Sequence, residues 1–172
     1  NIVAERTTLE LRGTCCLQLD QAPSPRQSIM RSRSFASPID TWNDMEEAVA
    51  TFMTRAAEKL RQQHCVAGVL SVSLATDPYN ETERRYANHV SVHLPTATDD
   101  TLELIRQARL AVRQIWKSGY RYKKAGVRLT SFQPKQQTQL DLWQTTEDTE
   151  TTDRADSIMN VLDAINSTMG AD

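Results

Sequence analysis

The feature that most constrains the fold is a long amphipathic pattern over residues 42–63. Its apolar side chains recur every three or four positions, as on one face of an α-helix: Trp42, Met45, Val49, Phe52, Met53, Ala56 and Leu60. Thr41 precedes the pattern and Asp44 follows three residues later, which is typical of a capped helix start. A helix with one apolar stripe must bury it, so the rest of the chain has to supply the partner surface.

A second helical pattern begins near Thr98 and Asp99 and ends at Gly119, a residue type that commonly follows a helix. Its apolar positions are again three and four residues apart: Leu102, Ile105, Ala108, Val112, Ile115 and Trp116. We therefore predict two amphipathic helices with one buried face each.

Three further stretches alternate between apolar and polar residues, the period of a half-buried β-strand: 69–75, 89–94 and 123–132. We expect Pro95 to end the second of them. The side chains predicted to face the core are Leu70, Val72, Leu74, Val90, Val92, Leu94, Ala125, Val127 and Leu129. Those predicted to face away are Ser71, Ser73, His89, Ser91, His93, Lys124, Gly126, Arg128 and Thr130.

A short basic stretch, residues 26–37, precedes the first helix and is also β-capable. It holds three arginines, and no acid follows before Asp40. Strand alternation puts Arg31 and Arg33 on one side and the residues between and around them on the other. Such a stripe suits a phosphate backbone, and the alternative is an edge strand that uses arginine to deter aggregation.

The order of these patterns is β-α-β-β-α-β. The simplest way to bury every apolar face is an α+β fold in which a four-stranded antiparallel sheet carries both helices on one side. The opposite sheet face is then polar and basic, while acids such as Asp44 and Glu103 lie on the helices. This separation favours nucleic acid as a partner. The scarcity of aromatic residues on that face argues against stacking on single-stranded bases.

Charge divides the chain of 172 residues. Residues 144–172 hold seven acids and one base, a charge of −6, so the net charge of −2 leaves +4 for residues 1–143. A mildly basic body with an acidic tail fits a nucleic-acid binder, although an ordinary soluble protein has the same balance. Adjacent Cys15 and Cys16 with a single Cys65 form a poor disulfide framework, so we expect reduced thiols and a cytoplasmic location.

No metal site or catalytic centre is predicted. His89 and His93 share a strand face and His64 adjoins Cys65, but a metal site needs more convergent ligands. Cys65 lacks a supporting general base and is expected to be buried. We find no apolar run long enough to span a membrane and no signal peptide, and the start at Asn1 suggests a piece of a longer protein.

Weaker patterns flank the body. Residues 5–19 begin with a helical pattern that ends at Gly13, and a proline-containing linker precedes the basic strand. After Pro134 a polar linker leads to an apolar cluster at 139–143, which either binds a pocket on a partner or folds back on the domain. Residues 153–169 are predicted to form a last helix. Its apolar stripe must be buried on the domain, on a partner or on a neighbouring molecule: Ile158, Val161, Leu162, Ile165 and Met169.

Several motifs, in this order, resemble the C-terminal part of UmuC-type subunits of DNA polymerase V and their plasmid or mobile-element relatives, which are Y-family translesion polymerases. The matching stretches are Glu10-Leu-Arg-Gly13, Cys16-Leu-Gln-Leu19, Ser32-Arg-Ser-Phe35, Arg55-Ala-Ala-Glu-Lys-Leu-Arg61, Ile115-Trp116 with Gly119, Arg121-Tyr-Lys-Lys-Ala-Gly-Val127 and Gln139-Leu-Asp-Leu-Trp143. The resemblance covers nearly the whole chain and weakens after about residue 145.

The resemblance implies the end of a thumb and a linker at 1–22, a little-finger domain at 23–135, and a flexible clamp-binding tail with a possible short helix (153–169) at 136–172. It also implies that the sheet lies in the major groove of primer-template DNA and grips phosphates. Charge and alternation indicate which residues would contact the phosphates: Arg31, Arg33, Lys123, Lys124 and Arg128. The family's palm carboxylates and their magnesium ions would lie upstream, so no cofactor and no polymerisation are expected of this fragment.

The tail motif resembles the pentapeptide that binds the bacterial β sliding clamp: Gln139, Leu140, Asp141, Leu142 and Trp143. Trp143 departs from the usual phenylalanine. The family further implies a UmuD-type dimer and RecA as partners in SOS mutagenesis. Two functions remain open: a DNA-gripping, clamp-tethered domain of a translesion polymerase, or an interaction module for these proteins with DNA contact secondary.

Overall fold

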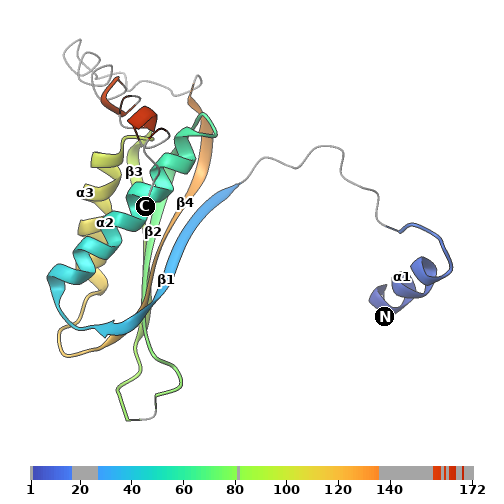
Figure 1. The fold of residues 1–172 in the computed structure, drawn as a ribbon, viewed down its shortest axis with the longest axis horizontal. Helices are drawn as coiled ribbons and strands as arrows, with labels where there is room; N and C mark the ends of the chain where they lie inside the picture. Colours follow the sequence, from blue (N-terminus) through green and yellow to red (C-terminus); the bar gives the residue numbers. More distant parts are fainter. Residues whose placement is uncertain are drawn as a thin grey trace.

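The computed structural model describes residues 2–16, 27–80, 82–135, 157–159, 161, 163–165 and 168. The elements are α1 (Ile2–Leu11), β1 (Ser28–Ile39), α2 (Trp42–Arg61), β2 (Cys65–Thr76), β3 (Ala87–Thr98), α3 (Thr101–Ile115) and β4 (Tyr122–Pro134). From β1 to β4 the order is β-α-β-β-α-β, as the sequence patterns predict (Figure 1).

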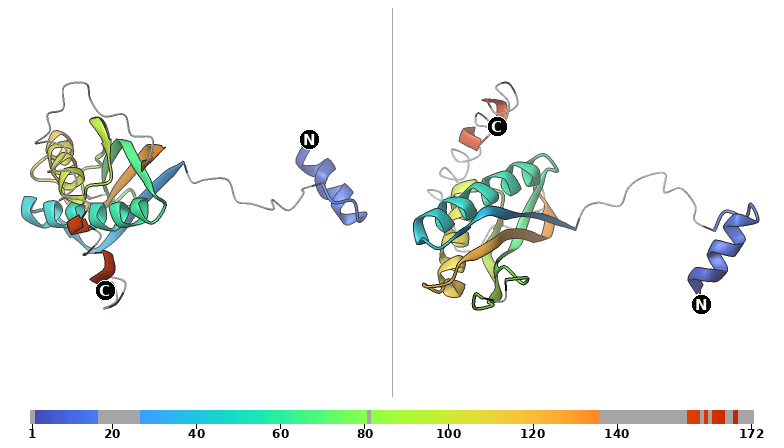
Figure 2. Two further views of the ribbon diagram at one scale, coloured as in Figure 1. Left: turned by 90° about the horizontal axis from the view of Figure 1, so that it is seen from above. Right: turned by 60° about the horizontal axis from the view of Figure 1, so that its bottom comes forward.

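The four strands form one antiparallel sheet in the order β1-β4-β2-β3, so the last strand of the chain lies in the middle. Both α2 and α3 cover the same side of this sheet, and within the described residues no helix covers the other side (Figure 2). Helix α2 packs over β1 and β4, and α3 packs over β2 and β3. The predicted α+β architecture is therefore confirmed.

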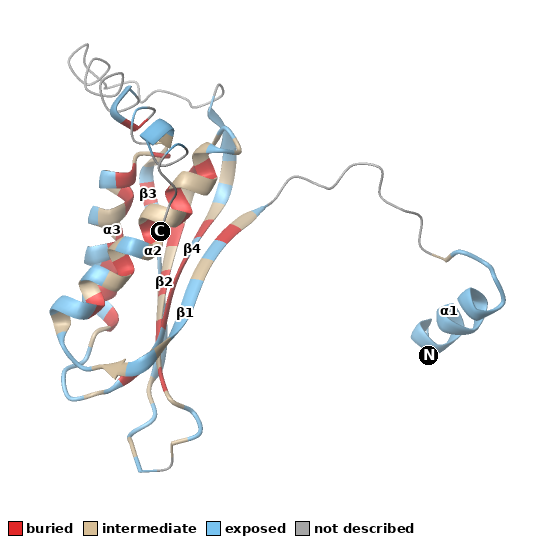
Figure 3. Cartoon of the chain, in the orientation of Figure 1, coloured by how far each residue is buried: buried red, intermediate tan, exposed pale blue. Residues whose placement is uncertain are grey.

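The helix α2 begins where its cap predicts. Thr41 is the N-cap, and its Oγ1 accepts a hydrogen bond from the backbone N–H of Asp44 at 3.3 Å. The side chains of Met45, Val49 and Met53 are fully buried, as their spacing requires. Burial alternates along most of β2 and over parts of β4, where residues 125–127 are all buried (Figure 3).

The predicted phase of α3 is wrong at its start. Asp100 is the N-cap, and its side chain accepts from the N–H of Leu102. This start places Leu102 outward with 68% of its surface exposed, whereas Leu104 is buried in its place. Helix α3 ends at Ile115, so Gly119 lies in the following turn, with a positive φ of 81°, and is not the helix terminator.

Pro95 does not end its strand, because β3 continues to Thr98. The register with β2 shifts between Ala67 and Val69, which pair with Thr98 and His93 respectively. β3 is an edge strand, and an edge strand tolerates a proline where the ladder is irregular. On the other edge, β1 likewise runs through Pro38 at a register shift.

The described part of the predicted last helix is helical, and the described members of its apolar stripe are not buried on the body, while Leu162 and Met169 lie outside the described residues. Ile158, Val161 and Ile165 are 56%, 59% and 47% exposed, whereas Met159 is buried. Asp163 accepts two hydrogen bonds from the guanidinium of Arg61, at 2.6 and 2.7 Å. The helix therefore contacts the body through its other side.

At the N-terminal end, α1 stops two residues before Gly13, which has a positive φ of 84°, in agreement with the predicted glycine stop. The linker residues 17–26 and the motif at 139–143 lie outside the described residues. Within the described residues, no helix is long and apolar enough to cross a membrane. The division into three regions stays a prediction.

Candidate nucleic-acid interface

The helix-free side of the sheet, called the open face here, is defined by cross-strand register, because directly paired residues project to the same side. It consists of four rows across β1, β4, β2 and β3. The rows are Ser34, Lys124, Ala75 and Ala87; Ser32, Gly126, Ser73 and His89; Met30, Arg128, Ser71 and Ser91; and Ser28, Thr130, Val69 and His93. The open face thus contains cations, hydroxyls and imidazoles but no carboxylate.

Lys124 and Arg128 are the two cations of the open face, and both are exposed. They lie on the central strand β4, four residues apart, which is about 13 Å along a strand. Around them the serine hydroxyls bond within the sheet: Ser71 and Ser91 share a hydrogen bond of 2.8 Å between their Oγ atoms. This leaves two separated positive charges above a surface of short side chains.

Lys123 is placed differently from its neighbour. Tyr122 pairs with Thr76 and Lys124 pairs with Ala75, so Lys123 is the extra residue of a β-bulge. Its Nζ donates to the backbone carbonyl of Ala36 at 3.1 Å. The ammonium therefore lies at the β1 edge near the end of the sheet.

The structure does not bring Arg31 and Arg33 to the open face. Arg31 pairs with Val127 and Arg33 with Ala125, and both partners face the helices. The predicted grouping of the five cations on one surface is therefore wrong, although the predicted alternation along β1 is confirmed. The neighbours Ile29 and Phe35 have the same parity and pack into the core, which was the sequence signal for this orientation.

Gly126 lies at the centre of the open face, where β1 and β4 approach closely. A Cβ at this position would meet the Cβ of Ser32 at 2.7 Å and the carbonyl oxygen of Arg31 at 3.3 Å. The first distance is shorter than real Cβ contacts. The glycine is thus required by packing within the sheet, and it also keeps the middle of the open face flat.

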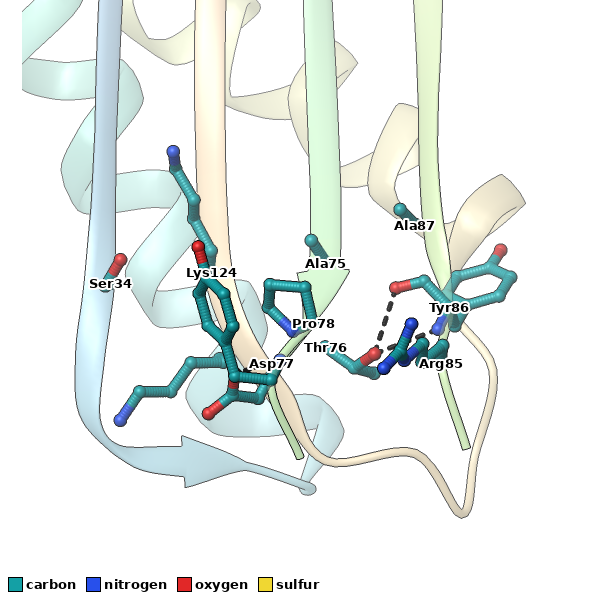
Figure 4. A pocket seen from close by; sticks show the side chains of 11 residues that line it. Ser34, Ala75, Thr76, Asp77, Pro78, Arg85, Tyr86, Ala87 and Lys124 are labelled. Atoms are coloured by element: carbon teal, nitrogen blue, oxygen red, sulfur yellow. Dashed lines mark hydrogen bonds between the residues drawn. The ribbon is translucent and has the colours of Figure 1, made fainter. Parts of the chain in front are cut away.

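A cavity of about 610 Å³ lies at the hairpin end of the open face, and residues of the β2–β3 connection line it (Figure 4). Its floor is the row of Ser34, Lys124, Ala75 and Ala87, and the connection adds further residues that the sequence patterns did not single out: Asp77, Pro78, Tyr79, Arg85 and Tyr86. The side chain of Tyr79 is 90% exposed. The cavity residues of the β2–β3 connection lie in a polar loop, which has no periodic pattern that could have identified them.

Within the described residues, no group of three or more His, Cys, Asp or Glu side chains could hold a metal ion. His89 and His93 lie on the open face in separate rows. Cys65 is only half-buried, and its Sγ donates to the carbonyl of Gln63 at 3.2 Å. The absence of a cofactor in this chain stays a prediction.

Comparison with known proteins identifies the relationship. A family model described as the impB/mucB/samB family C-terminal domain matches residues 26–142. The chain belongs to the impB/mucB/samB family. This membership confirms the resemblance to the C-terminal part of UmuC-type proteins.

Relatives in the impB/mucB/samB family align along almost the whole chain. Protein MucB of Salmonella typhimurium is 40% identical over 165 residues, which is 96% of this chain and 38% of MucB. Protein UmuC of Salmonella typhimurium strain LT2 is 37% identical over 170 residues, which is 99% of this chain and 40% of UmuC. The chain thus spans about two fifths of the length of these relatives.

A solved complex of the beta-clamp processivity factor and the little finger domain of PolIV contains a chain that is 18% identical to this one. The alignment covers 68% of this chain and 99% of that chain, with a TM-score of 0.45.

Proposed function

We propose that this chain is the DNA-gripping and clamp-tethering part of an error-prone translesion DNA polymerase of SOS mutagenesis. Its open face would hold phosphates of primer-template DNA, and residues Gln139 to Trp143 would bind a β sliding clamp. The polymerase chemistry, with its magnesium ions, would belong to the upstream part of a longer cytoplasmic protein. This fragment alone would not polymerise.

One observation carries the DNA proposal: the four rows of the open face hold Lys124 and Arg128 but no carboxylate. A cationic surface without acids attracts phosphates regardless of base sequence, because binding releases counterions from the nucleic acid. The short serine side chains and Gly126 keep the surface low between the two charges, so a DNA backbone is able to approach the sheet.

The test is the binding of fluorescently labelled primer-template DNA by the wild-type chain and by the Lys124→Ala, Arg128→Ala double variant at several salt concentrations. Each lost phosphate contact reduces the slope of log affinity against log salt by about 0.9 for duplex DNA, so we expect a slope shallower by about 1.8. An Arg106→Ala, Arg109→Ala variant is the control, because it removes the same charge from the outer side of α3. Equal slopes for wild type and the Lys124, Arg128 variant would refute the proposal.

The clamp proposal rests on the sequence of the motif. Leu142 and Trp143 offer apolar surface to a pocket, and short peptides of this kind bind at about micromolar strength, roughly −8 kcal/mol. We expect a Gln139→Ala, Leu142→Ala, Trp143→Ala variant to lose clamp binding in a calorimetric titration while its DNA binding stays unchanged. Clamp binding that survives in this variant would show that the tail motif is not the tether.

A second candidate function is an interaction module whose main partners are the clamp, a UmuD-type dimer or RecA. The observation that favours it is the exposed side of the last helix, where Ile158, Val161 and Ile165 lie at helical spacing. Apolar exposed stripes of this kind are common at protein interfaces. Binding of such a partner would be nearly insensitive to salt, whereas DNA binding would weaken steeply as salt rises.

A further inference from the structure

A second basic surface lies on the helix side of the edge strand, away from the open face. It is a groove of about 600 Å³ between β1 and α2, called the edge groove here. Arg31 and Arg33 enter it from β1, and Arg55 and Lys59 enter it from α2. Glu58 is the one carboxylate among its lining residues, so four cations face a single acid.

Of the four cations of the edge groove, Arg55 has a salt bridge to a described carboxylate. Glu58 pairs with Arg55 at 3.8 Å, and no described carboxylate forms a salt bridge with Arg31, Arg33 or Lys59. The Nε of Arg31 is buried, and among the described residues it has no hydrogen-bond partner. A buried guanidinium nitrogen without an acceptor is costly, and because solvent does not reach this atom, an anion would bond it only after the Arg31 side chain moves.

We propose that the edge groove is a second phosphate-binding site, which holds the phosphodiester backbone of DNA separately from the open face. The guanidinium groups of Arg31 and Arg33 suit phosphate oxygens because planar N–H donors match them in pairs, and Lys59 adds a point charge. The proposal deepens the proposed DNA function and rests on it. β1 borders both surfaces, since Ser32 and Ser34 project to the open face and Arg31 and Arg33 to the groove.

Protection of an exposed sheet edge is the competing explanation of the two β1 arginines, because inward-pointing charges on an edge strand discourage pairing with another chain. That explanation does not account for Arg55 and Lys59, which lie on α2 and face the same groove. The two explanations also differ in what they predict. Edge protection changes self-association, whereas a phosphate site changes DNA affinity and its salt dependence.

The test compares three double variants of the 172-residue chain: Arg33→Ala with Lys59→Ala in the groove, Lys124→Ala with Arg128→Ala on the open face, and the α3 control. Arg33 is exposed and Lys59 is half-buried, so neither substitution opens the core. Lys59→Gln alone is a milder variant that keeps most of the side chain. Each is titrated by fluorescence anisotropy with a blunt duplex, a duplex with a single-stranded template overhang, and the single strand alone, at several salt concentrations.

We expect the groove variant to have a shallower salt slope than the control, by about 1.8 if the two contacts lie on duplex DNA and by about 1.4 if they lie on a single strand. The three DNAs distinguish contacts to duplex DNA from contacts to a single strand. If the groove binds a single strand, the substitutions weaken binding of the overhang duplex and the single strand but not of the blunt duplex. A groove variant that binds all three DNAs like the control overturns the proposal, as does one that only aggregates. An unchanged open-face variant would instead refute the proposed function of the sheet, so the two failures are distinguishable.

Discussion

Gly126→Ala would test how closely β1 and β4 approach at the centre of the open face. The added Cβ would lie 2.7 Å from the Cβ of Ser32, 3.3 Å from the carbonyl oxygen of Arg31 and 3.3 Å from the Oγ of Ser73. The Oγ of Ser73 can rotate away, but the other two atoms belong to or adjoin the backbone of a paired strand. The strands would have to separate locally.

The expected cost follows from two opposing effects. Overpacking a close contact costs about 1–3 kcal/mol. Replacing glycine by alanine recovers about 0.4–1 kcal/mol, because the unfolded chain has less conformational freedom to lose. The free energy of unfolding should therefore fall by about 1–2 kcal/mol. With a urea dependence of about 2 kcal/mol per molar, the unfolding midpoint would drop by about 0.5–1 M.

Urea unfolding followed by circular dichroism measures this change, and Gly68→Ala is the matched control. A Cβ at Gly68 would meet the Oγ of Ser131 at 3.3 Å and the Ser131 carbonyl at 3.4 Å, so we expect a clearly smaller shift. Adding Ser32→Gly to Gly126→Ala removes the closest contact and should restore part of the midpoint. A Gly126→Ala variant as stable as wild type, or one that Ser32→Gly fails to rescue, would refute this reasoning.

Two further predictions concern polar groups of the fold. Asp163→Asn should release the last helix from Arg61, because it weakens a bidentate contact of 2.6 and 2.7 Å. Hydrogen bonds to charged groups contribute about 1.5–3 kcal/mol, so amide hydrogen exchange in the described residues of the last helix should become at least about tenfold faster. The urea midpoint of the sheet should stay unchanged. Tyr122 is fully buried, and this burial raises the pKa of its hydroxyl above the ordinary value near 10. The unfolded chain therefore ionises first, and the free energy of unfolding should fall as pH rises above about 10. Tyr122→Phe should remove this loss of stability at alkaline pH. It should also lower stability at neutral pH, because the Tyr122 hydroxyl accepts from the N–H of Lys117 and donates to its carbonyl. An equal loss of stability at alkaline pH in wild type and variant would contradict the role given to Tyr122.

The sequence predicts the type and order of the elements well, because the local signals agree with the packing. Thr41 caps α2 where the motif places it, and the alternation of Leu70, Val72 and Leu74 matches their burial. In these elements one periodic stripe leaves only one way to bury the apolar surface. Element ends were less predictable, since Pro95 is accommodated on an edge strand whose position depends on the whole sheet.

The candidate site was predicted only in part. Alternation separates Arg31 and Arg33 from their neighbours, and only the parity that they share with Ile29 and Phe35 indicates which side of the sheet they occupy. That choice is made by long-range pairing with β4, where Arg31 meets Val127 on the helix side. The open-face positions of Lys124 and Arg128 were predictable because Ala125 and Val127 between them mark the buried side. Arg55 and Lys59 were missed as groove residues, because a helix pattern does not identify its neighbouring strand.

The strand order also governs how the domain is assembled. β4 is the last strand in sequence, yet it lies between β1 and β2 and is the one strand that joins them. Before residues 122–134 are in place, the β2–β3 hairpin is able to form, but β1 has no strand to pair with in this sheet. The sheet is therefore completed by contacts between distant parts of the chain, which slows folding. A chain truncated before Tyr122 would lose the connection between the two halves of the sheet, and with it both the open face and the wall of the edge groove.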